Sequence, residues 1–244
     1  MNREVILDLH NHSSCSYDAS NRFAHYKRCF ERRFFDVLGI TDHNTLKAKN
    51  LFENEEFKVI MGEEIDTRDG ELIGLFLEEH VTPFRTIFDT AKEIKARGGL
   101  VYLQHPYYRW LRKAQRLHPH TIHALMSERL VDIVEAANAG PFMSSSNRKA
   151  QDLARHWDVV EGAGSDAHHP SDIGRCTVGV HLDGDPRDLT PDELMVSLRS
   201  GHIHRERVRN SAITLSCRLG YAWKVAYGRL GGAEKHTRYP EGDK

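Results

Sequence analysis

The chain has 244 residues, a length that a single α/β barrel domain can occupy, and its formal net charge is −1. This balance argues against a general nucleic-acid binder that works by bulk charge, and no apolar run is long enough to span a membrane. Because the four cysteines are scattered and the first residues lack an apolar signal-peptide core, we expect a cytoplasmic protein in a reducing compartment.

Short apolar runs recur along the chain, and most of them end at a His, Asp or Glu residue. The runs are apolar throughout, a pattern typical of strands that are buried on both faces, as in a parallel sheet. The seven expected strands cover residues 5–9, 35–40, 57–61, 71–77, 99–103, 131–136 and 159–164.

Segments with helical periodicity alternate with these runs. One of them ends in a glycine pair suited to a helix C-terminus, and the last opens with Thr190 as its cap and Pro191 in its first turn. Strands that alternate with helices predict an α/β fold, a (βα) barrel one unit short of eight. The expected helices cover residues 22–33, 86–99, 120–130, 144–157 and 191–200.

The composition changes near residue 205. Residues 205–244 carry nine Lys or Arg against four Asp or Glu, and residues 214–230 fit a basic amphipathic helix. We therefore expect a barrel over residues 1–204, followed by a basic C-terminal helix and tail that pack on the same domain. Contact of this segment with nucleic acid or with a membrane surface is the alternative. The sequence sets no oligomeric state.

Residues of the kinds that bind metal ions gather where the expected strands end. His10 and His12 stand two apart, so on a strand both imidazoles point to the same side. N and O ligands without thiolate suit Mn²⁺, Fe²⁺ or Zn²⁺. Nine candidates are too many for one ion, so two or three divalent ions are expected. The nine are His10, His12, Asp18, His43, Glu64, Glu71, His105, Asp166 and His168.

These motifs, in this order, resemble the PHP family, named for polymerase and histidinol phosphatase. The resemblance covers about residues 4–181 and rests on the HxH pair, TDH at 41–43, a strand-end Glu, HP at 105–106 and GSDAH at 164–168. Family members are metal-dependent phosphoesterases, so the resemblance implies that activity and a distorted (βα)7 TIM-like barrel, here with a C-terminal helical extension.

The resemblance also implies how three ions would be held. The first ion would take His10, His12, Glu64 and Asp166. Glu64 would bridge to a second ion, which His105 also binds. The third would take Asp18, His43 and His168. Glu64 is preferred to Glu63 because Glu64 aligns with the Glu of the family's GxE motif.

One position departs from the family's pattern. Many members carry a His on the fourth strand, where this chain has Glu71. We interpret Glu71 as a carboxylate replacement, and a solvated charge at the strand start is the alternative. Asp42 and Glu135 are expected behind the ligands, where they would orient imidazoles or take protons.

The residues and the resemblance lead to one functional hypothesis, hydrolysis of a phosphate ester through a metal-bridging hydroxide. A small phosphomonoester or nucleotide-type substrate is expected, with Arg175 and Arg148 as candidates for phosphate contacts, since a guanidinium fork matches phosphate. An exonuclease acting at phosphorylated nucleic-acid ends, a phosphatase for protein phosphotyrosine and an amidohydrolase on the same metals are the alternatives. A non-catalytic module is disfavoured by the complete set of ligands.

Overall fold

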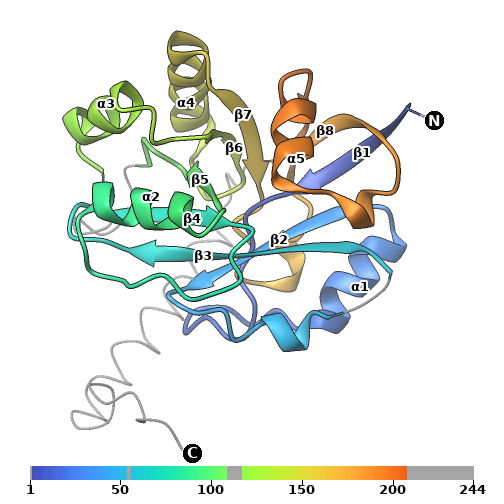
Figure 1. The fold of residues 1–244 in the computed structure, drawn as a ribbon. Coiled ribbons are helices and arrows are strands. Elements are labelled where there is room, and N and C mark those ends of the chain that lie inside the picture. Colours follow the sequence, from blue (N-terminus) through green and yellow to red (C-terminus); the bar gives the residue numbers. More distant parts are fainter. Residues whose placement is uncertain (1, 54–55, 109–116, 208–244) are drawn as a thin grey trace, which may run out of the picture. The chain divides into compact units, whose positions relative to one another are not determined.

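The computed structural model describes residues 2–53, 56–108 and 117–207 (Figure 1). The strands are β1 (Asn2–Asp8), β2 (Val37–His43), β3 (Lys58–Asp66), β4 (Glu71–Leu75), β5 (Leu100–Leu103), β6 (Ile133–Asn138), β7 (Val160–Gly164), β8 (Cys176–Asp183) and β9 (His202–Glu206). The α-helices are α1 (Phe23–Glu31), α2 (Ile87–Ala96), α3 (Pro119–Ser127), α4 (Ser144–Trp157) and α5 (Pro191–Leu198). Short 3-10 turns are η1 (Lys49–Leu51), η3 (Pro170–Asp172) and η4 (Pro186–Asp188).

The strands form one sheet in the order β7-β6-β5-β4-β3-β2-β1-β8-β9 (Figure 1). Backbone hydrogen bonds beyond the ladders bring β7 back to the end of β1. The Leu9 amide donates to the Ala163 carbonyl at 3.0 Å, and the Asp166 amide donates to the His10 carbonyl at 2.8 Å. Strands β1 to β7 thus curl into a nearly closed barrel, which confirms the predicted α/β, TIM-like architecture. β8 and β9 extend the sheet from the other side of β1 in antiparallel pairings.

β4 departs from the parallel arrangement. It pairs antiparallel with both β3 and β5, and it follows β3 after a tight turn in which the Thr67 amide donates to the Gly70 carbonyl at 2.7 Å. A turn this short permits only an antiparallel hairpin, because a parallel neighbour needs a long crossover connection. The apolar run of β4 predicted burial correctly, but the expected parallel direction is wrong for this strand.

Alternate residues of the central strands pack into two separate layers. Ile73 and Tyr102 join a cluster that also contains β1 residues, whereas Leu72 and Val101 pack against α2, α3 and α4. All four side chains are fully buried. Burial of one large apolar side chain contributes about 1.5–3 kcal/mol, so both faces of each strand stabilise the barrel. This two-sided burial explains why the strand sequences are apolar throughout.

Two helix ends have the predicted chemistry. The Thr190 hydroxyl accepts from the Glu193 amide at 3.3 Å, and the Glu193 carboxylate accepts from the Thr190 amide at 2.9 Å, which makes a capping box at the start of α5. Gly98, with φ of 76°, follows α2 in the left-handed conformation that favours glycine at this position.

The expected C-terminal segment begins inside the sheet. Arg205 and Glu206 belong to β9, so they form strand and not helix. The rest of the segment from residue 208, with the expected basic helix at 214–230, lies outside the described residues. Within the part of the chain that is described, no helix is both long and apolar enough to cross a membrane.

Candidate metal centre

Side chains from five strand ends and one loop meet at the C-terminal ends of β1, β2, β3, β5 and β7, as expected for an α/β barrel. His43 is the last residue of β2, Glu64 lies near the end of β3 and His105 follows β5. The remaining ligand-type residues, His10, His12, Asp18, Asp166 and His168, lie in the segments after β1 and β7.

Backbone contacts join the segment after β1 to the segment after β7. Besides the bond from the Asp166 amide to His10, the His12 amide donates to the Ala167 carbonyl at 3.2 Å. Gly164 makes this approach possible, because a Cβ atom there would lie only 2.2 Å from the His10 Cβ. The pair His10 and His12 and the pair Asp166 and His168 are therefore brought together by the closure of the barrel itself.

Two of the candidate ligands have unusual backbone conformations. His105 has φ of 24° and Asp166 has φ of 49°, in the left-handed region that costs a residue other than glycine about 1–3 kcal/mol. Hydrogen bonds hold both positions, since the His105 amide donates to Glu135 Oε2 at 2.7 Å and the Asp166 amide is bonded to His10. Backbone strain of this kind concentrates at functional sites.

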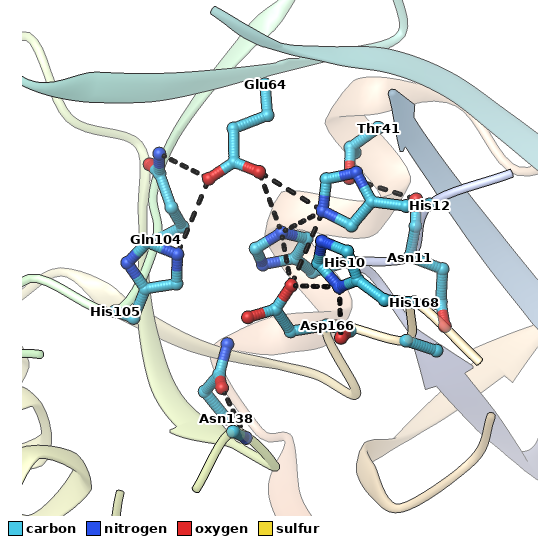
Figure 2. A network of polar contacts seen from close by, with 12 residues as sticks. His10, Asn11, His12, Thr41, Glu64, Gln104, His105, Asn138, Asp166 and His168 are labelled. Atoms are coloured by element: carbon cyan, nitrogen blue, oxygen red, sulfur yellow. Dashed lines mark hydrogen bonds and ion pairs between the residues drawn. The ribbon is translucent and has the colours of Figure 1, made fainter. Parts of the chain in front are cut away.

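The carboxylate of Glu64 lies between His105 on one side and His10 and His12 on the other (Figure 2). Its Oε2 atom is 3.1 Å from His12 Nε2, 3.4 Å from His10 Nε2 and 3.6 Å from His43 Nδ1. Its Oε1 atom faces the other way and lies 3.4 Å from His105 Nε2. One carboxylate thus contacts imidazoles on both of its sides.

Two aspartates complete the cluster. Asp166 Oδ1 is 3.4 Å from His12 Nε2, 3.6 Å from His10 Nε2 and 3.4 Å from His168 Nδ1. Asp18 Oδ2 lies 3.3 Å from His168 Nε2. The same Asp18 atom lies 3.4 Å from His43 Nε2.

The contacts form three overlapping groups whose ligand atoms all lie within 4.8 Å of one another. The groups are His10, Glu64 and His105; His10, His12 and Asp166; and His12, Asp18, His43 and His168. They fit divalent ions, because ligands about 2.0–2.2 Å from one ion are separated by about 3.0–3.5 Å, close to the separations seen here. Among the described residues, Asp18 Oδ1 and His43 Nδ1 are buried without a hydrogen-bond partner. These two atoms can therefore coordinate an ion.

Glu135 orients the first imidazole. Its Oε1 atom is 2.9 Å from His10 Nδ1, so Nδ1 donates to Glu135 and Nε2 is turned toward Glu64 and Asp166. The Tyr102 hydroxyl and the Asn138 amide also donate to the Glu135 carboxylate, at 3.2 and 2.9 Å. The carboxylate is fully buried and contacts His10, and its role in orienting that imidazole for a metal ion stays a prediction.

Asp42 acts on the second imidazole through a serine. The Ser16 hydroxyl donates to Asp42 Oδ1 at 2.8 Å, and it accepts from His12 Nδ1 at 3.2 Å and from the His43 amide at 3.0 Å. Two further bonds from Ser13, both of 2.6 Å, fix the Asp42 carboxylate. His12 Nε2 is thereby turned toward the cluster.

The electrostatics of the site couple imidazoles to carboxylates. Burial lowers the pKa of His43, but the charge of Glu64 and a hydrogen bond with Asp18 raise that pKa to about 10. Burial likewise lowers the pKa of His168, but Asp18 and Asp166 raise that pKa to about 9. Burial raises the pKa of Glu64, yet the charges of His43 and His10 hold this pKa well below its usual range. The carboxylates are therefore ionised and available to cations.

The contacts of Glu63 and Gln104 could not be assigned from the sequence. Glu63 turns away from the cluster, where its carboxylate lies 2.7 Å from His80 Nδ1 and accepts from the Val81 amide at 2.9 Å. Gln104 was not predicted as a site residue, although it directly precedes His105. Its side-chain amide donates to Glu64 Oε1 at 3.2 Å and so fixes the central carboxylate.

Besides Asp42 and Glu135, three predicted site residues lie outside the three groups. Glu71 is buried at the start of β4. The pKa of His43 is lowered by the burial of His43 itself, and the charge of Glu71 is among the influences that raise this pKa. The Arg175 guanidinium donates to the backbone carbonyls of Ser171 and Arg207 at 3.1 and 3.4 Å, and Arg148 is exposed on α4. Metal binding by Glu71 and phosphate binding by the two arginines remain predictions.

Sequence relatives place the chain in a family. It is 30% identical over 237 residues to the uncharacterized protein MJ0417 of Methanocaldococcus jannaschii, with 92% of this chain and 90% of that protein covered. Residues 144–203 match the model of the PHP-associated family. The chain belongs to the PHP family.

This PHP protein shares its fold with solved structures. One is a two-domain protein from Bacteroides vulgatus that contains a predicted PHP-like metal-dependent phosphoesterase, with a TM-score of 0.64, 18% identity, and 84% of this chain and 66% of that chain covered. Another is the lesion-specific endonuclease PfuEndoQ from Pyrococcus furiosus, with a TM-score of 0.59, 16% identity, and 82% and 58% covered. The PHP protein thus spans at most about two thirds of either chain, and identities this low show the shared fold alone.

Proposed function

We propose that this PHP protein is a metal-dependent phosphoesterase that uses two or three divalent ions of the Mn, Fe or Zn type. The observation that carries the proposal is the position of Glu64, whose two oxygens face separate groups of imidazoles. A carboxylate in this position serves two neighbouring ions, the arrangement of two-metal hydrolytic sites. The nine predicted residues, His10, His12, Asp18, His43, Glu64, Glu71, His105, Asp166 and His168, are proposed as the ligands.

Divalent ions at this site would lower the pKa of a water molecule and offset the charge of a phosphate group. The residues of the chain hold the ligands in place for this chemistry. Glu135 fixes the His10 ring, Ser16 fixes the His12 ring, and Gln104 fixes the Glu64 carboxylate. Because these side chains are already oriented, they lose little conformational entropy when ions and substrate bind.

We further propose a small phosphomonoester or nucleotide-type substrate. The Tyr17 ring, which is 67% exposed, lies beside the ligand His43, with ring centroids 5.1 Å apart in a stacked arrangement. An exposed aromatic face at the edge of the site suits stacking against a nucleobase, an interaction worth about 1–3 kcal/mol per base. A nuclease is the second candidate function, favoured by the fold shared with PfuEndoQ.

Hydrolysis of a panel of substrates, detected by release of phosphate, p-nitrophenol or nucleotides, tests both proposals. The Mn²⁺-loaded protein is incubated with p-nitrophenyl phosphate, its bis-ester, nucleoside bisphosphates, and short 5′-phosphorylated RNA and DNA. We expect activity that is lost in the His10→Ala and Asp166→Asn variants. Preference for nucleoside bisphosphates supports the small-substrate function, whereas preference for the oligonucleotides supports the nuclease. Metal-loaded protein that cleaves no member of the panel would contradict phosphoesterase activity and favour the amidohydrolase alternative.

A further inference from the structure

A second cluster of ligand-type side chains lies on the exposed face of β1 and β9. Glu4 belongs to β1, and His202 and His204 belong to β9. Their ligand atoms all lie within 4.8 Å of one another. Glu4 precedes His10 by six residues, and the part of β1 from Glu4 to Asp8 alone spans about 13 Å at 3.3 Å per residue, so this cluster is separate from the metal centre.

The middle strand leaves room for this cluster. β8 lies between β1 and β9, and its residue Gly179 has no side chain to separate them. A Cβ atom on Gly179 would lie 2.9 Å from the His202 ring and 3.0 Å from Glu4 Oε1. Strands two apart in a sheet are separated by about 9.5 Å, so Glu4 and His202 meet only because the strand between them has no side chain at Gly179.

The third side chain lies on the same face of β9, at a bulge in that strand. Arg205 and Ile203 pair with the consecutive residues Thr177 and Val178, so His204 is the extra residue that has no partner in the ladder. His202 and His204 stand two apart, so both side chains point to the same face of β9. His204 Nδ1 consequently lies 3.9 Å from Glu4 Oε1, the atom that His202 Nε2 approaches to 3.3 Å.

The three side chains have the chemistry of a metal site. Two imidazoles and one carboxylate are the protein ligands of many zinc sites that leave the fourth position to water. Ligands of one zinc ion lie about 3.3–3.5 Å apart, and the two measured separations lie near this range.

We propose that Glu4, His202 and His204 bind one divalent ion that prefers imidazole ligands, with Zn²⁺ as the probe. The ion would fasten β9 to β1 across β8. Within residues 2–207 as described, β9 is the last strand at its end of the sheet and pairs with β8 alone. The site is independent of the proposed hydrolytic activity, because it shares no residue with the metal centre.

Zinc stoichiometry of the full-length protein tests the proposal. Wild type, a His202→Gln/His204→Gln variant and a His118→Gln/His120→Gln variant are dialysed against the same free Zn²⁺, and bound zinc is measured by elemental analysis. His118 and His120 are a matched exposed pair, with ring centroids 5.0 Å apart, and they belong to none of the ligand groups among the described residues. We expect one zinc fewer per chain in the first variant and no change in the second.

Two further readouts decide the cause of a difference. Zn²⁺ should raise the melting temperature of the wild type and the matched variant more than that of the His202→Gln/His204→Gln variant, because a ligand stabilises only the state that binds it. Activity of the Mn²⁺-loaded proteins, where the panel detects it, should be equal in all three. Equal zinc content in all three proteins, or an equal rise in melting temperature, would overturn the proposal.

Discussion

At the scale of single residues, adjacent positions of β3 have opposite roles. Successive side chains of a strand point to opposite faces, so Glu64 enters the cluster while Glu63 bonds to His80 and Val81 on the other face. Both carboxylates are buried, so burial alone does not distinguish them. The contacts at each carboxylate identify Glu64 as the candidate ligand.

We expect Glu64→Gln to lose more than about 100-fold in phosphoesterase activity, since removal of a residue that merely supports a metal ligand already costs about 10–100-fold. Glu63→Gln is the matched control, with the same chemical change one residue away. It should keep its bound metal and activity, and lose about 1–3 kcal/mol of folding stability from its altered buried hydrogen bonds. Metal analysis, activity assays and urea unfolding of both proteins check this. Equal loss of activity in the two variants would contradict the assignment.

Ser16 is a small residue whose single hydroxyl makes three contacts that matter to the site. It links Asp42 to His12 and also accepts from the His43 backbone. We expect Ser16→Ala to weaken metal affinity about 10-fold, because the His12 ring loses the partner that fixes its orientation. Ser14→Ala, at an exposed position two residues away, should bind metal as the wild type does. Titration with Mn²⁺ measures both, and unchanged affinity in Ser16→Ala would contradict the orienting role.

At the scale of elements, the contact between β1 and β7 determines the geometry of the site. Gly164 allows it, since a side chain there would collide with the His10 Cβ and would approach Glu135 Oε1 to 2.7 Å. The backbone bonds that follow Gly164 hold the two ligand-bearing segments at a fixed separation. The site is therefore sensitive to the spacing of two strands as well as to its own ligands.

We expect Gly164→Ala to destabilise the fold by about 1–3 kcal/mol through overpacking, and to abolish activity because His10 is displaced. Gly98→Ala is the control, since Gly98 has a left-handed backbone but open space around its Cα. That substitution should cost about 1 kcal/mol and leave activity unchanged. Thermal unfolding and the phosphate-release assay compare the two. Wild-type activity in Gly164→Ala would show that this contact does not position His10.

The sequence predicted the strands that end in candidate ligands because these strands are buried on both faces and form continuous apolar runs. It missed β8 and β9. β8 carries Gly179 and His181 among its apolar residues, and β9 is a largely exposed, polar strand, so neither forms such a run. Ser16 and Gln104 were also missed as site residues, because a hydroxyl or an amide takes its role only from partners that tertiary structure brings to it.

At the scale of the whole molecule, protons and metal ions compete for the centre. Against the effect of burial, nearby carboxylates raise the pKa of His43 to about 10 and that of His168 to about 9. An imidazole binds a metal ion only after it has lost its proton. Below these pKa values the protons oppose the metal, so metal affinity falls as the pH falls.

We therefore expect Mn²⁺ binding near neutral pH to release about one proton from each of these two imidazoles, and affinity to rise between about pH 6 and 9. Calorimetric titrations in two buffers with different ionisation enthalpies measure the proton count. The His202→Gln/His204→Gln variant is used so that the outer cluster adds nothing to the signal. Binding that releases no proton would contradict the coupling.

The contact of β1 with β7 and β8 also affects how the protein is made. Ser165 donates to Asp8 from 157 positions further along the chain. On a ribosome that adds about 5–20 residues per second, these partners would be synthesised about 8–30 s after β1. During that interval β1, which directly precedes the HxH pair, can pair with β2, but the barrel is not yet closed. Contacts of such long sequence separation slow folding, so ions can be captured in the complete centre only after most of the chain has been translated.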